Sequence, residues 1–449
     1  MIDVRAFAAA ALSVLALVAA GCGTSVSGVA RGADLGTDAA ALVPPDATAF
    51  VAVDTDLESS QWQRVDDLTK SLPVRTKLLD RIQTELQKHG LTWKDDVAPA
   101  LGSELDIAAF GTAPANVEYV AFAKPDDEGK LRALASKLSE GADRYTVEKI
   151  AGWSVVADSQ ELFDRVRSAQ TGTSLSKVDA FRSAWSSVTG DALARAYVSG
   201  EGAASLLSKA GRTLGAAPDW LGARVAADGD ALRVEMTRHP VGTVAATAPV
   251  LLRDVPSGAS LAVAFHGLGN LLAQLPSTPL GTTLRPPQLA PLLSGEGVLY
   301  VRAAGVLPEV ALELTPKNPR ASLVSARRLL RVLAGSLGPL PLTAQLSGGK
   351  LVIADGPAAV AGLRGGAKLV DDADYKDALK TAGVPAKTTF LAYADVAELA
   401  PFVQLVVQAI GGQAPDPALV DNLSHVDKAL AWGSQQTGVS RISVWLRPR

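Results

Sequence analysis

The sequence predicts an α+β fold made of two tandem related α+β repeats with mostly antiparallel sheets, preceded by a flexible tether. Short runs of alternating or β-branched apolar residues, bounded by Gly, Pro and Asp, predict strands. Apolar residues at helical spacing, such as Leu131, Leu134, Ala135 and Leu138, predict helices. The same series of landmarks occurs twice, which predicts an internal duplication. Because strands follow one another as hairpins as often as they alternate with helices, antiparallel sheets are favoured over a doubly wound parallel sheet.

Residues 1–21 are expected to form a cleavable secretion signal. Arg5 supplies a minimal positive start, and the small apolar run from Ala6 to Ala20 is shorter than the roughly 20 apolar residues that span a bilayer. The segment Val18-Ala19-Ala20-Gly21-Cys22 resembles a bacterial lipobox, although Ala19 stands where a larger aliphatic residue is usual. This pattern predicts cleavage before Cys22 and lipidation of that cysteine. An ordinary signal followed by an incidental cysteine is the alternative.

Residues 22–42 are expected to be a flexible tether, because Gly, Ser and Ala dominate after Cys22. A tether of this composition reaches about 25 Å root-mean-square. Two or three acyl chains would anchor the protein firmly, whereas one chain alone is marginal. The predicted location is therefore extracytoplasmic, with the protein lipid-anchored to the outer face of the bacterial cell membrane.

The composition restricts the classes of partner. The formal net charge is −3, with no basic field suited to nucleic acid. Cys22 is the only cysteine, so its acylation would leave no thiol for a disulfide, and the fold must rely on packing. The chain is long enough for two ordinary domains with sizeable cores.

The first repeat is placed at 43–239, a connection at 240–254 and the second repeat at 255–449. Each repeat opens with Val-Pro before a strand, predicted at 49–53 and at 261–265. Each then has a Leu-Gly-Ser-Glu or Leu-Ser-Gly-Glu turn before a second strand. Later landmarks recur in the same order: strands at 119–123 and 310–314, helices at 130–138 and 323–333, strand ends at Asp158 and Asp355, helices with Phe181 and Tyr375, strands at 196–198 and 392–394, and final hairpins at 224–237 and 434–446. Chance matching within an Ala-rich composition is the alternative.

Several of these landmarks resemble those of domain-of-unknown-function family 3352. They are Leu42-Val43-Pro44-Pro45-Asp46-Ala47 before a strand, Trp93-Lys94-Asp95-Asp96-Val97 with Leu101-Gly102, the strand end Ala157-Asp158, and Gly190-Asp191-Ala192 before Ala196-Tyr197-Val198. The resemblance covers most of residues 42–240 and the remainder more weakly. The family is uncharacterised, so the resemblance implies an envelope location and no activity.

The residues of types common in catalytic and metal-binding sites do not match the spacing of a recognised motif. The histidines lack metal-ligand spacing; they are His89, His239, His266 and His425. Gly267-x-Gly269 follows a predicted strand like the start of a dinucleotide fingerprint, but Leu272 stands where the third glycine belongs, so a turn is expected.

Two further patterns have ordinary interpretations. Ser174-x-x-Lys177 has the spacing of a penicillin-binding nucleophile pair but lacks the accompanying motifs, so a loop before the Phe181 helix is expected. Aspartates cluster at Asp54-x-Asp56 and at Asp371, Asp372 and Asp374. They are interpreted as helix N-caps, with a calcium site as the alternative. We therefore predict no catalytic residue, no metal site and no cofactor.

The repeats differ most after their first strands. The stretch from Pro44 to Pro99 is crowded with charge and predicts solvated helices, whereas Pro256 to Pro291 carries only Arg285 and a histidine. Its leucines, interrupted by prolines that exclude a membrane-spanning helix, are Leu268, Leu271, Leu272, Leu275, Leu280 and Leu284. Such a segment is either buried in the protein or forms an apolar surface for a ligand or partner.

These observations predict a lipid-anchored cell-envelope protein with a non-enzymatic binding or scaffolding role. The membrane is the expected partner, through the N-terminal acyl chains, with an envelope protein or an apolar ligand as a second. One alternative is a carrier of a lipid or other apolar ligand that uses the uncharged segment 268–295. An unrecognised envelope hydrolase is another.

Overall fold

The structure, a computed structural model, describes residues 35–112, 117–139, 144–209, 217–240, 244–267, 292, 294–303, 308–337, 341–409, 417–436 and 438–449. The predicted signal, Cys22 and the leucines from Leu268 to Leu284 lie outside the described residues. Within the described ranges, no helix is long and apolar enough to cross a membrane.

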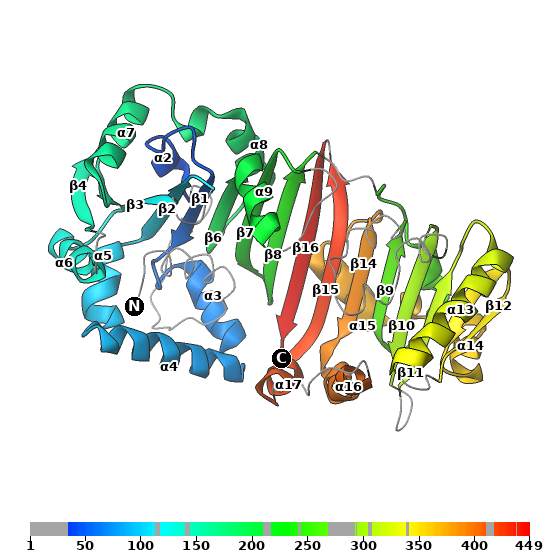
Figure 1. The fold of residues 1–449 in the computed structure, drawn as a ribbon. Helices are drawn as coiled ribbons and strands as arrows, with labels where there is room; N and C mark the ends of the chain where they lie inside the picture. Colours follow the sequence, from blue (N-terminus) through cyan, green and yellow to red (C-terminus); the bar gives the residue numbers. More distant parts are fainter. Residues whose placement is uncertain are drawn as a thin grey trace. The chain divides into compact units, whose positions relative to one another are not determined.

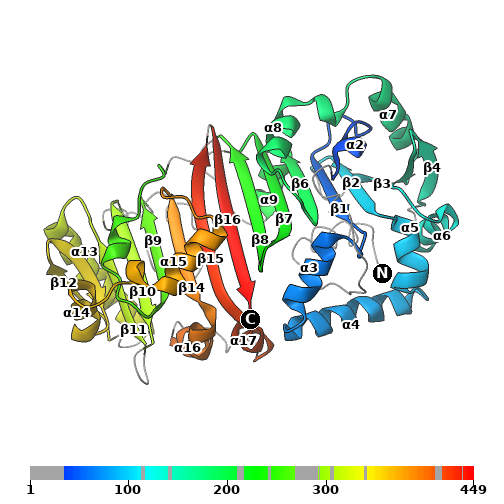
Figure 2. The same cartoon turned by 180° about the vertical axis from the view of Figure 1, so that it is seen from behind.

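The chain divides into two compact units, and each is an α+β domain, as predicted. The first unit contains Met1–Leu206 and Ala217–Pro240, and the second contains Leu207–Ala216 and Val241–Arg449. Figures 1 and 2 show the ribbon from opposite sides.

The first unit has eight described strands: β1 (Ala49–Asp54), β2 (Glu104–Phe110), β3 (Glu118–Ala123), β4 (Thr146–Ile150), β5 (Trp153–Ala157), β6 (Ala194–Ser199), β7 (Trp220–Asp228) and β8 (Ala231–His239). Its α-helices are α2 (Thr37–Ala40), α3 (Ser60–Thr69), α4 (Pro73–Lys88), α5 (Ala98–Leu101), α6 (Glu128–Leu138), α7 (Gln160–Thr171), α8 (Asp179–Ser187) and α9 (Gly200–Lys209), which begins in this unit. A π-helical turn spans Trp93–Val97 and a 3-10 turn spans Leu175–Lys177.

The second unit also has eight described strands: β9 (Ala259–His266), β10 (Glu296–Arg302), β11 (Glu309–Leu314), β12 (Thr343–Ser347), β13 (Lys350–Ala354), β14 (Phe390–Asp395), β15 (Val426–Gln436) and β16 (Val439–Pro448). Its α-helices are α13 (Pro319–Leu337), α14 (Pro357–Arg364), α15 (Ala373–Ala382), α16 (Val396–Ala409) and α17 (Pro417–Ser424). Two 3-10 turns span Val250–Arg253 and Leu369–Asp371.

The two units share one strand order. The sheet runs β4-β5-β3-β2-β1-β6-β7-β8 in the first unit and β12-β13-β11-β10-β9-β14-β15-β16 in the second. Counted from the start of each unit, both orders read 4-5-3-2-1-6-7-8. All described pairings between the named strands of a unit are antiparallel. This common topology is what the predicted duplication requires.

The glutamate of each Leu-Gly-Ser-Glu-like turn accepts a hydrogen bond from the segment that leads into the first strand of its unit. The Gly36 N–H donates to Glu104 Oε1 at 2.6 Å, and the Leu251 N–H donates to Glu296 Oε1 at 2.7 Å. The two landmarks therefore have the same structural role, which explains why they occur at the same place in both repeats.

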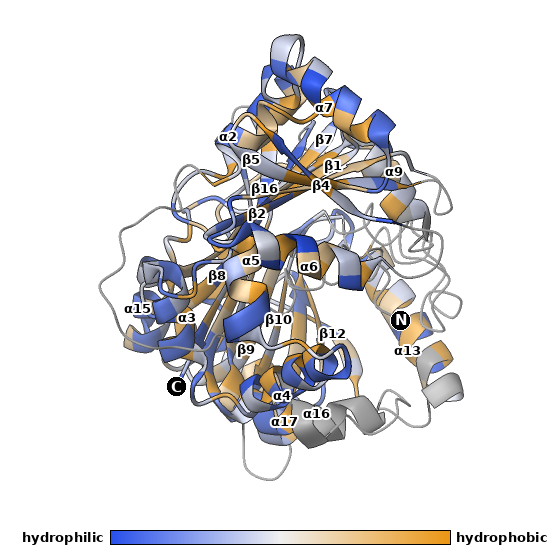
Figure 3. Ribbon diagram, turned by 90° about the vertical axis from the view of Figure 1, so that its left-hand side faces the viewer, coloured by the Kyte–Doolittle hydropathy of each residue, from blue (hydrophilic) through white to orange (hydrophobic). Residues whose placement is uncertain are grey.

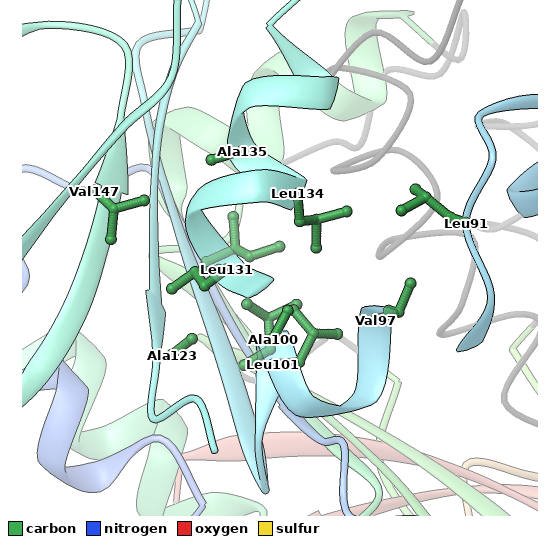
Figure 4. Packing of buried hydrophobic residues seen from close by; sticks show 11 residues of the cluster. Leu91, Val97, Ala100, Leu101, Ala123, Leu131, Leu134, Ala135 and Val147 are labelled. Carbon is green, nitrogen blue, oxygen red and sulfur yellow. The ribbon is translucent and has the colours of Figure 1, made fainter. Parts of the chain in front are cut away.

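Helices cover both faces of the first sheet. Phe181 and Trp185 on α8 pack against Phe50, whereas Leu131 on α6 packs into a cluster with Leu105 on the opposite face of the pleat. Figure 4 shows α6 above α5 in this cluster, with Leu131 and Leu134 directed toward Ala100, Leu101 and Val97. Figure 3 shows hydrophilic and hydrophobic bands alternating along α7, as expected for a helix with one buried face.

The predicted tether and connection are both longer than the structure allows. Of the predicted tether, residues 35–42 are packed into the first unit, where Leu35, Ala39 and Leu42 are buried. Leu251 and Leu252, predicted to lie in the connection, are buried in the second unit. The sequence did not predict this packing because the segments are short, and because the glutamates that accept their hydrogen bonds lie far along the chain.

Candidate functional site

An open pocket of about 430 Å³ lies in the first unit, between α2, α8 and the start of β6. Its lining combines two arginines, four hydroxyl side chains, two aromatic rings and one glycine: Arg182, Arg195, Thr37, Ser176, Ser186, Thr189, Phe181, Trp185 and Gly190. None of these residues is acidic. The pocket is therefore a candidate site for a ligand that carries negative charge and an apolar part.

Helix α8 builds the aromatic wall. Phe181, Ala184 and Trp185 are its buried residues, and their helical spacing places them on the face that packs on the sheet. The rings of Phe181 and Trp185 are stacked, with centroids 4.9 Å apart and an interplanar angle of 23°. The Phe50 ring lies 5.5 Å from that of Trp185 and supports it from the strand below. This packing fixes the indole in one orientation beside the pocket.

The indole nitrogen of Trp185 is a buried donor that has no acceptor in the described part of the chain. Trp185 is only 8% exposed, and its Nε1 has no hydrogen-bond partner among the described residues. A buried N–H that forms no hydrogen bond costs about 1–3 kcal/mol. Trp185 also lines the pocket, so this unsatisfied donor belongs to a residue of the pocket wall.

Arg195 contributes the cationic group from the sheet side. It is 3% exposed, its Nη2 donates to the Gly190 carbonyl at 2.9 Å, and its guanidinium carbon lies 5.7 Å from the Trp185 ring centroid. The loop after α8 approaches closely: a Cβ at Gly190, where φ is +101°, would meet Arg224 Nη1 at 2.4 Å. Arg224 also donates to the Thr189 carbonyl. Glycine at this position lets both arginines hold the loop that lines the pocket.

The strand register places Arg195 in a row of charged side chains across the sheet. Arg195 pairs with Ala52 on one side and Arg224 on the other; beyond them lie Asp106 and Glu235. The Arg224 Nε lies 3.2 Å from Glu235 Oε2. Glu235 thus offsets the charge of Arg224, and Arg195 is the cation of this row that lines the pocket.

The second unit has an uncharged row at the equivalent positions. The charged row of the first unit is Asp106, Ala52, Arg195, Arg224 and Glu235. In the same order, the second unit has Val298, Ala264, Leu391, Trp432 and Ser443. The fold therefore does not need the charged row. Because uncharged residues satisfy the same topology, the charged row is a specific property of the first unit.

Three carboxyls share this face of the sheet, two of them buried, Asp54 and Asp106, and one half-buried, Glu104. Burial, followed by the charge of Glu104, raises the pKa of Asp106 well above its ordinary value. Burial also raises the pKa of Glu104, and it raises the pKa of Asp54 to about 7. The side-chain oxygens of Asp106 have no conventional hydrogen-bond partner within the described part of the chain, although Glu104 lies beside them. Burial therefore favours the neutral form of Asp106, which reduces its negative charge beside the arginine row.

Arg182 forms the outer edge of the pocket. It pairs with Asp179 one turn earlier on α8, and both side chains are mostly exposed. An exposed pair of this kind contributes little to stability. Arg182 can therefore turn toward a bound anion without cost to the fold.

The structure gives ordinary roles to the serine and lysine at penicillin-binding spacing. Ser174 Oγ lies 2.9 Å from Ser176 Oγ, while Lys177 Nζ donates to the Gly172 carbonyl at 2.7 Å. Both residues lie at the 3-10 turn before α8, as predicted. Their side chains point to separate partners, so the spacing does not form a nucleophile and base here.

The aspartates have two different roles. Asp372 caps α15, as predicted, by accepting from the N–H groups of Asp374 and Tyr375. Asp54 is not an N-cap: its carboxylate accepts from the Ser59 hydroxyl at 2.6 Å and from the Asp56 N–H at 3.0 Å. It thereby shapes the turn into α3, whose N-cap is Ser59.

The described histidines are dispersed. His239 Nδ1 lies 2.8 Å from Asp219 Oδ2, His266 Nδ1 lies 3.0 Å from Thr247 Oγ1, and His425 Nδ1 lies 2.9 Å from the Asp421 carbonyl. Across the ranges that the structure describes, no group of three or more His, Cys, Asp or Glu residues is arranged to hold a metal ion.

Sequence reasoning missed Arg195 and Trp185. The strand at 196–198 was predicted, but its start at Ala194 was not, so the inward-facing arginine was left out of it. The sequence signal for Arg195 was an arginine placed between two small apolar residues, Ala194 and Ala196, at the start of this strand. Trp185 directly follows the start of the predicted Phe181 helix, but no sequence pattern singled it out.

Comparisons with known proteins add little. No protein-family model and no curated protein matches the chain. Crystal form I of a protein named TP0453 is similar over 73% of this chain and 98% of TP0453, with 12% identity and a TM-score of 0.18. Crystal form IV covers 72% and 95%, with 10% identity and a TM-score of 0.21. TM-scores this low carry no argument about fold or function.

Proposed function

We propose that this protein is a lipid-anchored cell-envelope binding protein, without enzymatic activity, whose first unit binds a small organic anion in the pocket beside Arg195 and Trp185. The sequence supports the location through the signal-like segment 1–21 and the lipobox-like residues that end at Cys22. The resemblance to family 3352 agrees with an envelope location.

The observation that carries the binding role is the Arg195–Trp185 wall of the pocket. It offers a buried guanidinium, a buried indole N–H without an acceptor among the described residues, and a stacked aromatic pair. Charge-assisted hydrogen bonds from arginine suit carboxylate and phosphate oxygens. The aromatic rings suit a planar or apolar body.

Calorimetric titration with phenyl phosphate tests this proposal, with benzyl alcohol and inorganic phosphate as probes of the apolar and anionic parts. We expect phenyl phosphate to bind more tightly than either. Arg195→Leu introduces the residue that the second unit has at this position, Leu391, and should lower the affinity about 10–100-fold, because a charged hydrogen bond is worth about 1.5–3 kcal/mol.

Arg233→Gln is the matched control, because it removes an arginine on β8 that pairs with Asp228 at 2.7 Å, outside the pocket lining. It should leave the affinity unchanged. Equal loss in both variants, or no binding of any organic anion in a wider panel of carboxylates and phosphates, would contradict the proposal. Release of phenol during the titration would instead favour a hydrolase.

A further inference from the structure

Helix α13 of the second unit and the residues just before it carry only positive charges. Residues 317–349 include no acidic residue, and their basic residues are Lys317, Arg320, Arg327, Arg328 and Arg331. All five side chains are exposed. In a chain whose net charge is −3, this is a strong local excess of positive charge.

The arginines share one face of α13 with exposed valines. Arg320, Val324, Arg328 and Arg331 follow one another at steps of four, four and three residues, which keeps them on the solvent side of the helix. Val324 is 69% exposed and Val332 is 43% exposed. The opposite side packs on the sheet, where Ala326 belongs to a core cluster with Phe265 and Leu351.

The described acidic residues do not neutralise this face of α13. Arg327 Nε donates to the Ala344 carbonyl at 3.2 Å, which holds α13 on β12. Within the described residues, Arg320, Arg328 and Arg331 form no ion pair. Their charges are thus directed to the solvent.

The equivalent helix of the first unit is balanced. On α6, Glu128 pairs with Arg132 at 2.6 Å and with Lys149 at 3.5 Å, and Lys130 pairs with Asp96 at 3.2 Å. Because the same topological position is neutralised in one unit and cationic in the other, the charge of α13 is not a requirement of the fold.

We propose that this face of α13, defined by Arg320, Val324, Arg328, Arg331 and Val332, binds the anionic phospholipid surface of a membrane. Basic side chains near an anionic bilayer each contribute about 1 kcal/mol. Exposed valines between them match the boundary of headgroups and acyl chains, where amphipathic helices lie in the plane of the membrane. A soluble polyanion would use the arginines but not the valines. The inference is independent of the pocket and needs no acyl anchor.

Vesicle co-sedimentation tests this inference. The chain is expressed from Gly23 onward, which keeps every described residue and removes Cys22. We expect it to bind phosphatidylcholine vesicles that contain about 30% phosphatidylglycerol, not pure phosphatidylcholine vesicles, and to be released at about 1 M salt, where the Debye length is about 3 Å.

The triple variant Arg320→Gln, Arg328→Gln and Arg331→Gln should bind these vesicles about 100-fold more weakly, since each arginine is worth about fivefold. The matched control removes three exposed lysines of the first unit, Lys70→Gln, Lys88→Gln and Lys137→Gln, and should bind as the wild type does. Equal weakening in the two triple variants would overturn the proposal.

Val324→Ser distinguishes a bilayer from a polyanion. It keeps every charge and should still weaken vesicle binding several-fold. If it leaves vesicle binding unchanged, or if soluble polyglutamate competes fully with the vesicles, α13 is a polyanion site and the membrane proposal is wrong. Circular dichroism of each variant confirms that the fold is retained.

Discussion

Replacing Asp54 by asparagine should stabilise the first unit at about pH 8 and leave it nearly unchanged at about pH 4. The folded protein raises the pKa of Asp54 from 3.8 to about 7, mainly by burial, with smaller contributions from Asp56 and Glu104. The folded state therefore holds this proton more tightly than the unfolded chain. The contribution of Asp54 is fully favourable below about pH 4 and is lost as the pH rises to about 7.

The magnitude follows from the proton affinity. A tenfold change in proton affinity is worth about 1.36 kcal/mol, so the ionised carboxylate lowers the free energy of unfolding by about 4 kcal/mol above pH 7. Asparagine has no proton to lose. Its oxygen can accept from the Asp56 N–H, and its amide can donate to the Ser59 hydroxyl, so both native contacts have a counterpart.

The assay must separate the two units, because a two-domain chain need not unfold in one step. Urea unfolding followed by pulsed hydrogen exchange and mass spectrometry measures the unfolding of β1 and β2 separately from that of β9 and β10. The strands of the second unit are the internal control, and Asp67→Asn is the control for removing an exposed carboxylate. If Asp54→Asn destabilises the first unit equally at both pH values, the reasoning is refuted.

Three further predictions concern the landmarks and the anchor. Gly102→Ala should destabilise the first unit by more than about 2 kcal/mol, because φ is +67° and a Cβ would lie 1.9 Å from the Lys124 carbonyl oxygen; unchanged urea unfolding would contradict this. Glu296→Ala should cost the second unit about 1–3 kcal/mol by removing the acceptor of the Leu251 N–H, and equal loss in both units would argue against a local role. Cys22→Ala should move the protein out of the membrane fraction without lowering its thermal stability, and continued palmitate labelling of the variant would rule out Cys22 as the anchor.

The order of helices and strands could be predicted from the sequence, because each element depends on the local pattern of apolar and polar residues. Phe181 and Tyr375 are equivalent residues of the two repeats, and so are Tyr197 and Tyr393. The structure confirms both equivalences. Phe181 contacts Tyr197 edge-on with ring centroids 5.3 Å apart, and Tyr375 contacts Tyr393 edge-on at 5.0 Å. Equivalent residues thus keep the same contact in both units.

The pocket could not be predicted from local pattern. Its wall depends on β6 lying between β1 and β7, which places Arg195 beside Ala52 and Arg224. These partners are far apart in the sequence, and their register emerges only when the sheet is assembled. The alternation in strand 194–199 marks Arg195 as facing a covered side of the sheet but does not identify what lies there.

The most direct test of the binding role is the indole N–H resonance of Trp185 during titration with phenyl phosphate. Trp185→Phe identifies the resonance by its disappearance. We predict a progressive downfield shift of this resonance as the ligand supplies an acceptor, while those of Trp432 and Trp445 in the second unit stay in place. If phenyl phosphate binds without moving the Trp185 resonance, or moves all indole resonances equally, the proposed site is wrong.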